Sequence, residues 1–141
     1  TRMMGNFVLR QCELALVDMS LYDSELPASS EELENSILEI SNRYSLFPRG
    51  QEYQLYCSFL HIFWGWYGAG YYSYMRAELL EADVFQKIKE NWIFSPQIWN
   101  LYRDKILAQG CRKPARELFS DFMWRDPDSK ALMKKYWLID N

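Results

Sequence analysis

The residues best suited to chemistry lie close together between positions 61 and 74. His61 is the only histidine among the 141 residues, and Tyr67, Tyr71 and Tyr74 follow it, the tyrosines at spacings of four and three. Each of the three phenols can donate a hydrogen bond while uncharged, because an unperturbed phenol has a pKa of about 10, and a neutral imidazole also carries one N–H donor. Wherever the segment is helical, tyrosines at these spacings project from one face. The pattern predicts hydroxyl donors that converge on one ligand.

Glycines interrupt this segment at positions 65, 68 and 70. Since glycine has the widest backbone freedom, they predict a loop that bends around a ligand and flexes over it. Trp66 stands between the first two, and its bulky side chain makes a positive φ costly there. We expect Trp66 to stiffen the loop and to fill part of a cleft, and we expect Tyr72 to pack in the core. An alternative stays open, in which the tyrosines fill an aromatic core and the glycines merely form turns.

The elements before this segment are predicted to be helical. Apolar residues recur densely over 3–22, and neither proline nor glycine interrupts 6–22. This pattern favours a largely buried helix. Ser29 to Glu32 reads as a capping box, in which Glu32 reaches back to the serine N–H. Apolar residues then recur on one helix face, at Leu33, Ile37, Ile40 and Tyr44. Residues 53–63 alternate poorly, so a short strand and an extended segment both remain open.

The elements after the segment are also predicted to be helical. One helix should begin near Ala69 or Gly70 and run to about Glu90, and Ser95-Pro96 should start the next, with Gly110 as its terminator. Pro114 and Asp126-Pro127 should open two short helices. The sequence therefore predicts an all-α protein, a single compact domain of six or seven helices with little or no sheet.

Composition argues against several classes of function. With 16 Lys and Arg against 19 Asp and Glu, the chain lacks the positive groove that would let its aromatic residues bind nucleic acid by stacking. No apolar run reaches the roughly 18 residues of a membrane span, and no secretory leader pattern opens the chain. Cys12, Cys57 and Cys111 form no CxxC pair, which favours buried, reduced thiols. We expect a cytoplasmic protein without nucleic-acid or membrane partners.

A long motif runs from His61 to Phe85, with the sequence HIFWGWYGAGYYSYMRAELLEADVF. It resembles the substrate-recognition segment of the zinc oligopeptidase family that includes thimet oligopeptidase, oligopeptidase A and the peptidyl-dipeptidases. The family pattern is approximately His-Ile-Phe-x-Gly-Gly-Tyr-x-Ala-Gly-Tyr-Tyr-x-Tyr, followed by Ala-Glu and Ala-Asp-x-Phe. The similarity continues upstream at 14–19 and downstream at 93–96 and 118–119, so it covers nearly the whole chain.

The resemblance implies a mainly helical zinc metallopeptidase, a metalloendopeptidase or oligopeptidase, that hydrolyses short peptides. It implies three catalytic residues: Tyr71 and Tyr74 as transition-state donors, and His61 as a donor to the substrate backbone or the oxyanion. It also implies that the substrate-binding residues include Gly65, Trp66, Tyr67 and Gly68.

The family's zinc ligands, a His-Glu-x-x-His helix and a further glutamate, precede the region that this chain matches. A hydrolytic zinc needs about three protein ligands, and this chain has one histidine and no such motif. With its start at Thr1, the sequence predicts that residues 1–141 are a C-terminal substrate-recognition fragment, inactive alone. Its partners would be short peptides and the remaining N-terminal part of the peptidase, with zinc bound in the full-length parent and no metal ligand in this chain.

Two departures from the family pattern leave a second hypothesis open. Trp66 stands where the family has a second glycine, and Arg76 stands where an aromatic residue is common. Together with the missing zinc motif, they are compatible with a non-catalytic helical module that binds peptides or a partner.

Overall fold

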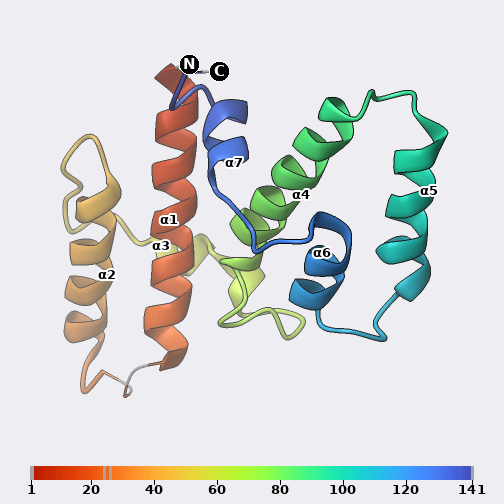
Figure 1. Ribbon diagram of the computed structural model, residues 1–141. Helices are drawn as coiled ribbons and strands as arrows, with labels where there is room; N and C mark the ends of the chain where they lie inside the picture. Colours follow the sequence, from red (N-terminus) through yellow and green to blue (C-terminus); the bar gives the residue numbers. More distant parts are fainter. Residues whose placement is uncertain (1, 24, 26, 141) are drawn as a thin grey trace. The chain divides into compact units, whose positions relative to one another are not determined.

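The computed structural model describes residues 2–23, 25 and 27–140 (Figure 1). These residues form seven α-helices and two short 3₁₀ turns, without a strand, which confirms the predicted all-α class and helix number. The chain divides into two compact units, one ending at Met75 and the other beginning at Arg76. None of the described helices is long and apolar enough to cross a membrane.

The first unit is built on two helices that pack side by side, α1 (Arg2–Asp23) and α2 (Ser30–Tyr44) (Figure 1). Both match the predicted segments. Ser29 caps α2 by accepting a hydrogen bond from the Glu32 N–H at 3.2 Å, as predicted. The Glu32 carboxylate, however, accepts from the Ala28 N–H at 2.7 Å instead of from the serine's own N–H. The reciprocal half of the capping box therefore closes one residue earlier than expected.

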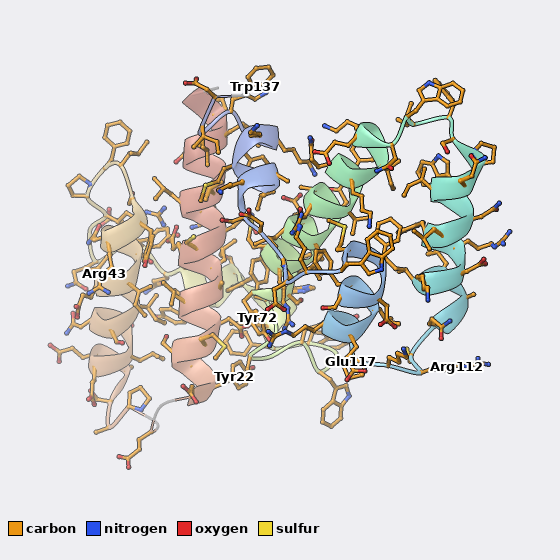
Figure 2. The ribbon with its side chains drawn as sticks, in the orientation of Figure 1. Tyr22, Arg43, Tyr72, Arg112, Glu117 and Trp137 are labelled. Carbon is orange, nitrogen blue, oxygen red and sulfur yellow. The ribbon has the colours of Figure 1, made fainter. Side chains whose placement is uncertain are left out.

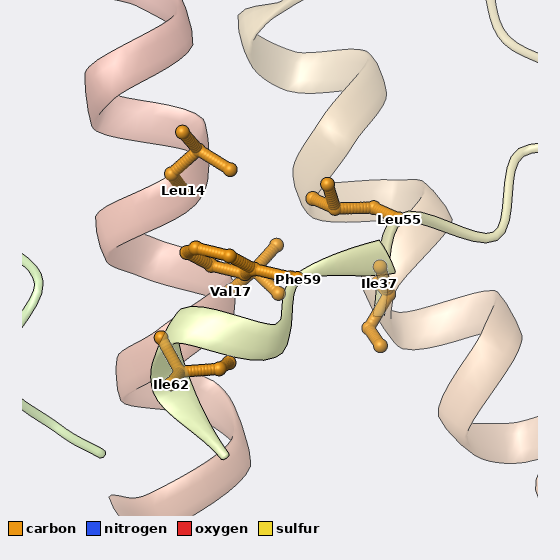
Figure 3. Close-up of a cluster of buried hydrophobic side chains, with 6 residues drawn as sticks. All are labelled: Leu14, Val17, Ile37, Leu55, Phe59 and Ile62. Atoms are coloured by element: carbon orange, nitrogen blue, oxygen red, sulfur yellow. The ribbon is translucent and has the colours of Figure 1, made fainter. Parts of the chain in front are cut away.

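The core of this unit joins three segments (Figure 3). Its buried side chains come from α1, from α2 and from the turns that follow, and they are Leu14, Val17, Ile37, Leu55, Phe59 and Ile62. The last three lie on α3 (Leu55–Ser58), just after it, and on the 3₁₀ turn η1 (Leu60–Ile62). The alternatives of a strand or an extended segment over 53–63 are therefore both wrong. Spacings of four and three let helical turns bury these three side chains together, and this burial fixes the position of η1.

The second unit contains the remaining helices, which are α4 (Ser73–Glu90, whose first residues belong to the first unit), α5 (Pro96–Lys105), η2 (Leu107–Gln109), α6 (Ala115–Met123) and α7 (Lys130–Lys135). Its core combines apolar residues of α4, α5 and α6, namely Val84, Ile88, Ile98, Phe119, Phe122 and Met123. The buried Asp83 carboxylate accepts hydrogen bonds from both terminal nitrogens of Arg125 and from the Asp128 N–H. This ionic contact ties the chain after α6 to α4.

Helix boundaries in this half differ from the predictions at three places. Gly110 has a φ of +55° but ends the turn η2, since α5 already stops at Lys105. Asp126 does not cap α7; its carboxylate accepts from Arg116, and Ser129 is the residue before the helix. The helix α4 starts at Ser73, three or four residues later than predicted, because the residues before it form turns.

Candidate functional site

The four predicted donor side chains gather in the first unit. His61 lies on η1, Tyr67 on the loop that follows, Tyr71 just before α4 and Tyr74 in its first turn. The His61 ring stacks on Tyr67 with centroids 4.8 Å apart and lies 5.8 Å from Tyr71 and 5.7 Å from Tyr74. The Tyr71 and Tyr74 rings are 5.3 Å apart. The fold therefore places one imidazole among three phenols.

The polar tips of this cluster are in hydrogen-bonding range. The Tyr74 hydroxyl lies 3.2 Å from His61 Nε2, so the phenol donates in one imidazole tautomer and accepts in the other. Tyr74 and Tyr67 are both about half exposed, so part of each side chain is accessible to a ligand. The cluster therefore combines donors that already contact each other with access from solvent.

Tyr71 lies deeper than its neighbours. Its ring packs edge-on against Phe59, with centroids 5.1 Å apart. Burial raises the pKa of the Tyr71 phenol above its ordinary value, and the nearby Tyr74 raises it further, against opposing effects of Gln11 and Arg10. Tyr71 is thus held as a neutral hydroxyl, which can donate a hydrogen bond at physiological pH.

The rings converge through a loop and not through helix periodicity. Only Tyr74 lies on α4, so the alignment expected wherever the segment is helical does not apply to Tyr67, and Tyr71 lies just before the helix instead of on the face predicted for it. The loop instead turns at positions with left-handed backbone, at Gly65 (φ +73°), Trp66 (+69°) and Ala69 (+57°). Because residues 70–72 also form a turn, Tyr72 is exposed, and the prediction that it packs in the core is wrong.

Two residues of α1 hold this loop, and the motif itself did not point to them. Asp18 is fully buried, and its carboxylate oxygens accept hydrogen bonds from the N–H groups of Ala69 (2.9 Å) and Tyr71 (2.8 Å). Tyr22, labelled in Figure 2, donates from its hydroxyl to the Ile62 carbonyl at 2.6 Å. These residues are four apart and so share one helix face. The available signal was Asp18 itself, a charged residue inside a helix predicted to be largely buried.

Gly68 is required by a close approach. A Cβ at this position would lie 2.4 Å from Cζ of Tyr22, which is far inside van der Waals contact. Trp66 keeps the left-handed backbone despite its side chain, and its ring is fully exposed. The predicted substrate-binding residues Gly65, Trp66 and Gly68 border one open hollow of about 430 Å³. The other residues that line it are Tyr22, Ile62 and Phe63.

The described residues do not offer a metal site. Among them, no three His, Cys, Asp or Glu side chains lie close enough together to hold a metal ion. Cys12, Cys57 and Cys111 are unbridged, and the prediction that they are buried is wrong for Cys57 and Cys111, which are exposed. A hydrolytic zinc needs about three protein ligands, so the described residues do not fit one.

Comparison with known proteins identifies the family. The model of peptidase family M3 matches residues 1–138. The chain belongs to peptidase family M3. This match confirms the resemblance of the motif at 61–85 to the oligopeptidase family that includes oligopeptidase A.

Curated relatives of this M3 chain are peptidases. The chain is 33% identical to oligopeptidase A of Escherichia coli over 130 residues, which cover 92% of the chain and 19% of that relative. It is 33% identical to an organellar oligopeptidase A of Arabidopsis thaliana over 139 residues (96% and 18%). It is 30% identical to saccharolysin of Saccharomyces cerevisiae over 138 residues (94% and 18%). The M3 chain therefore spans about a fifth of the length of these relatives.

Proposed function

We propose that this chain is the substrate-recognition and transition-state-stabilising portion of a zinc-dependent M3 oligopeptidase that hydrolyses short peptides. The observation that carries the proposal is the cluster of His61 with Tyr67, Tyr71 and Tyr74 in a chain of this family. Zinc would be held by residues of the full-length parent outside this chain, because the described residues offer no fitting ligand set. The fragment alone is expected to be inactive.

The catalytic part of the proposal rests on neutral donors. Attack on a peptide carbonyl gives a tetrahedral oxyanion, and donors aimed at that charge lower the barrier by about 3–4 kcal/mol each. Tyr71 and Tyr74 would supply phenol O–H groups, and His61 would donate to the oxyanion or the substrate backbone. In the free site, His61 and Tyr74 are within hydrogen-bonding distance of each other, at 3.2 Å. A developing oxyanion would draw both groups away from this mutual contact.

The binding part of the proposal rests on the loop. Tyr67 stacks on His61 with an interplanar angle of 21°, so its ring is held beside the imidazole. Gly65, Trp66 and Gly68 border the adjacent open hollow, where an extended peptide could lie against the exposed indole. We therefore propose short peptides as the ligands of this face, with Trp66 as the residue that narrows their range.

Partners and compartment follow from the same proposal. The remaining part of the parent peptidase would be the chain's permanent partner, and nucleic acid and membranes are not proposed as partners. We propose a cytoplasmic location, in line with one similar protein that is named a probable cytosolic oligopeptidase A.

The test is Tyr74→Phe in the full-length protein. Removing one transition-state donor should lower kcat by roughly 10²–10³-fold and leave KM for a short peptide within about threefold. Tyr72→Phe is the matched control, since Tyr72 is an exposed phenol two residues away that does not belong to the ring cluster. Its kinetics should equal those of the wild type. Unchanged turnover in Tyr74→Phe would remove the transition-state role.

A second function, a non-catalytic peptide- or partner-binding module, is favoured by the lack of a fitting ligand set in the described residues together with the exposed Trp66. The coding sequence upstream of Thr1 separates the two. A His-Glu-x-x-His helix in the same frame would support the peptidase, and a native start codon at this point would support the module.

A further inference from the structure

Asp18 makes an unusual connection between α1 and the loop. Its side chain is fully buried, and each carboxylate oxygen accepts one loop N–H group, from Ala69 at 2.9 Å and from Tyr71 at 2.8 Å. The two N–H groups flank Gly70 and lie more than fifty positions away in sequence. One side chain thus holds the loop on both sides of the glycine that precedes the donors.

This connection suits a positioning task. Hydrogen bonds from N–H groups to a carboxylate are stronger than those to neutral acceptors, and a buried carboxylate needs such partners. One of the bonds holds Ala69, which has a φ of +57°, a backbone conformation that residues other than glycine rarely adopt. The other fixes the main chain of Tyr71, from which the phenol ring projects. Without these two hydrogen bonds, fewer interactions would stabilise the left-handed backbone of Ala69 and the position of the Tyr71 main chain.

We propose that Asp18 is a positioning residue of the peptidase site, which holds the 69–71 turn so that the hydroxyls of Tyr71 and Tyr74 converge beside His61. The inference rests on the proposed function for its catalytic consequence. It predicts that loss of the carboxylate displaces transition-state donors, and that this lowers kcat more than it raises KM.

The test combines amide hydrogen exchange with kinetics in the full-length protein. Asp18→Asn keeps the size of the side chain, but its NH₂ group faces one of the two N–H donors. Exchange of peptides that cover residues 66–72 should accelerate at least about tenfold. In the same variant, kcat should fall about 10–100-fold while KM stays within about threefold.

Glu13→Gln is the matched control. Glu13 is an equally buried carboxylate on the same helix, but it contacts Arg10, Arg49 and Tyr53 instead of the loop. This variant should unfold at lower denaturant concentration, with loop exchange as in the wild type.

The wild-type protein provides a further measurement. The amides of Ala69 and Tyr71 should exchange about 100-fold more slowly than the amide of the exposed Trp66.

The outcome that would refute the role of Asp18 differs from the outcome that would refute the proposed function. Unprotected Ala69 and Tyr71 amides in the wild type, or wild-type loop exchange in Asp18→Asn, would overturn the role of Asp18 and leave the proposed function intact. Faster loop exchange with unchanged kcat would overturn the positioning role. A wild-type protein without peptidase activity, but with loop exchange that depends on Asp18, would instead refute the proposed function.

Discussion

Replacing Gly68 with alanine should push the Tyr22 ring out of its place. The added Cβ would lie 2.4 Å from Cζ of Tyr22 and 2.8 Å from both Cε atoms. Carbon atoms in good contact are about 3.5–4.0 Å apart, so the ring must retreat by more than about 1 Å. The Tyr22 hydroxyl donates to the Ile62 carbonyl at 2.6 Å, and a retreat of this size breaks that hydrogen bond. The substitution therefore combines a steric clash with a lost anchor of η1.

The expected loss of unfolding free energy is about 2 kcal/mol. Overpacking costs about 1–3 kcal/mol, and the lost hydrogen bond costs about 0.5–1.5 kcal/mol. We take the lower part of the summed range because Tyr22 is 47% exposed and can move towards solvent. Urea unfolding followed by circular dichroism measures the change. Gly5→Ala is the control. Gly5 lies in α1, where the added Cβ would meet no atom within 4 Å beyond its chain neighbours and the backbone of its own helix, and the substitution should stabilise the chain by about 0.5–1 kcal/mol.

The same substitution in a Tyr22→Ala background tests the reasoning. With the ring removed, alanine at position 68 should cost less than about 0.5 kcal/mol, so the double-mutant cycle should give a coupling of about 1.5 kcal/mol. An equal penalty with and without the ring would refute the steric explanation of Gly68.

Two further predictions concern a titration and a buried ion pair. Burial raises the pKa of Tyr71, so the stability that its neutral phenol contributes is fully present below about pH 10 and is lost as the pH rises through the folded-state pKa. Urea midpoints should therefore fall with alkaline pH more steeply in the wild type than in Tyr71→Phe, and parallel curves would contradict this. Asp83→Ala should lower the unfolding free energy by about 2–3 kcal/mol, below the usual 3–5 kcal/mol for a broken buried pair, because water can solvate the half-exposed Arg125. A loss under about 0.5 kcal/mol in urea unfolding would show that the pair contributes little.

Most helices could be predicted because their signals are local. Uninterrupted apolar residues specify α1, and the serine at position 29 and the proline at position 96 mark the starts of α2 and α5. Local signals failed at 53–63, where short helical turns are stabilised by burial of Leu55, Phe59 and Ile62 against other segments. Such turns have no periodicity long enough to recognise. The late start of α4 has a similar cause, since tertiary hydrogen bonds hold the preceding turn.

The grouping of the candidate side chains could be predicted, but the way the fold brings them together could not. The motif placed His61 and the three tyrosines together, and the rings do lie within 6 Å of the imidazole. The roles of Asp18 and Tyr22 depend on contacts across 40 or more positions, and one sequence contains no measure of such distances. The positive φ of Trp66 could not be predicted either, because a tryptophan adopts this backbone conformation only where its surroundings impose it.

The long separation between Asp18 and the loop has a consequence for the order of folding. Contacts across 51 and 53 positions close a large chain loop, and that entropy must be lost before the two hydrogen bonds form. The turn at 69–71 should therefore become ordered only after α1 has docked on its neighbours. Early in folding, the tyrosine rings would not yet be packed around His61. The site would then be among the last parts of its unit to mature.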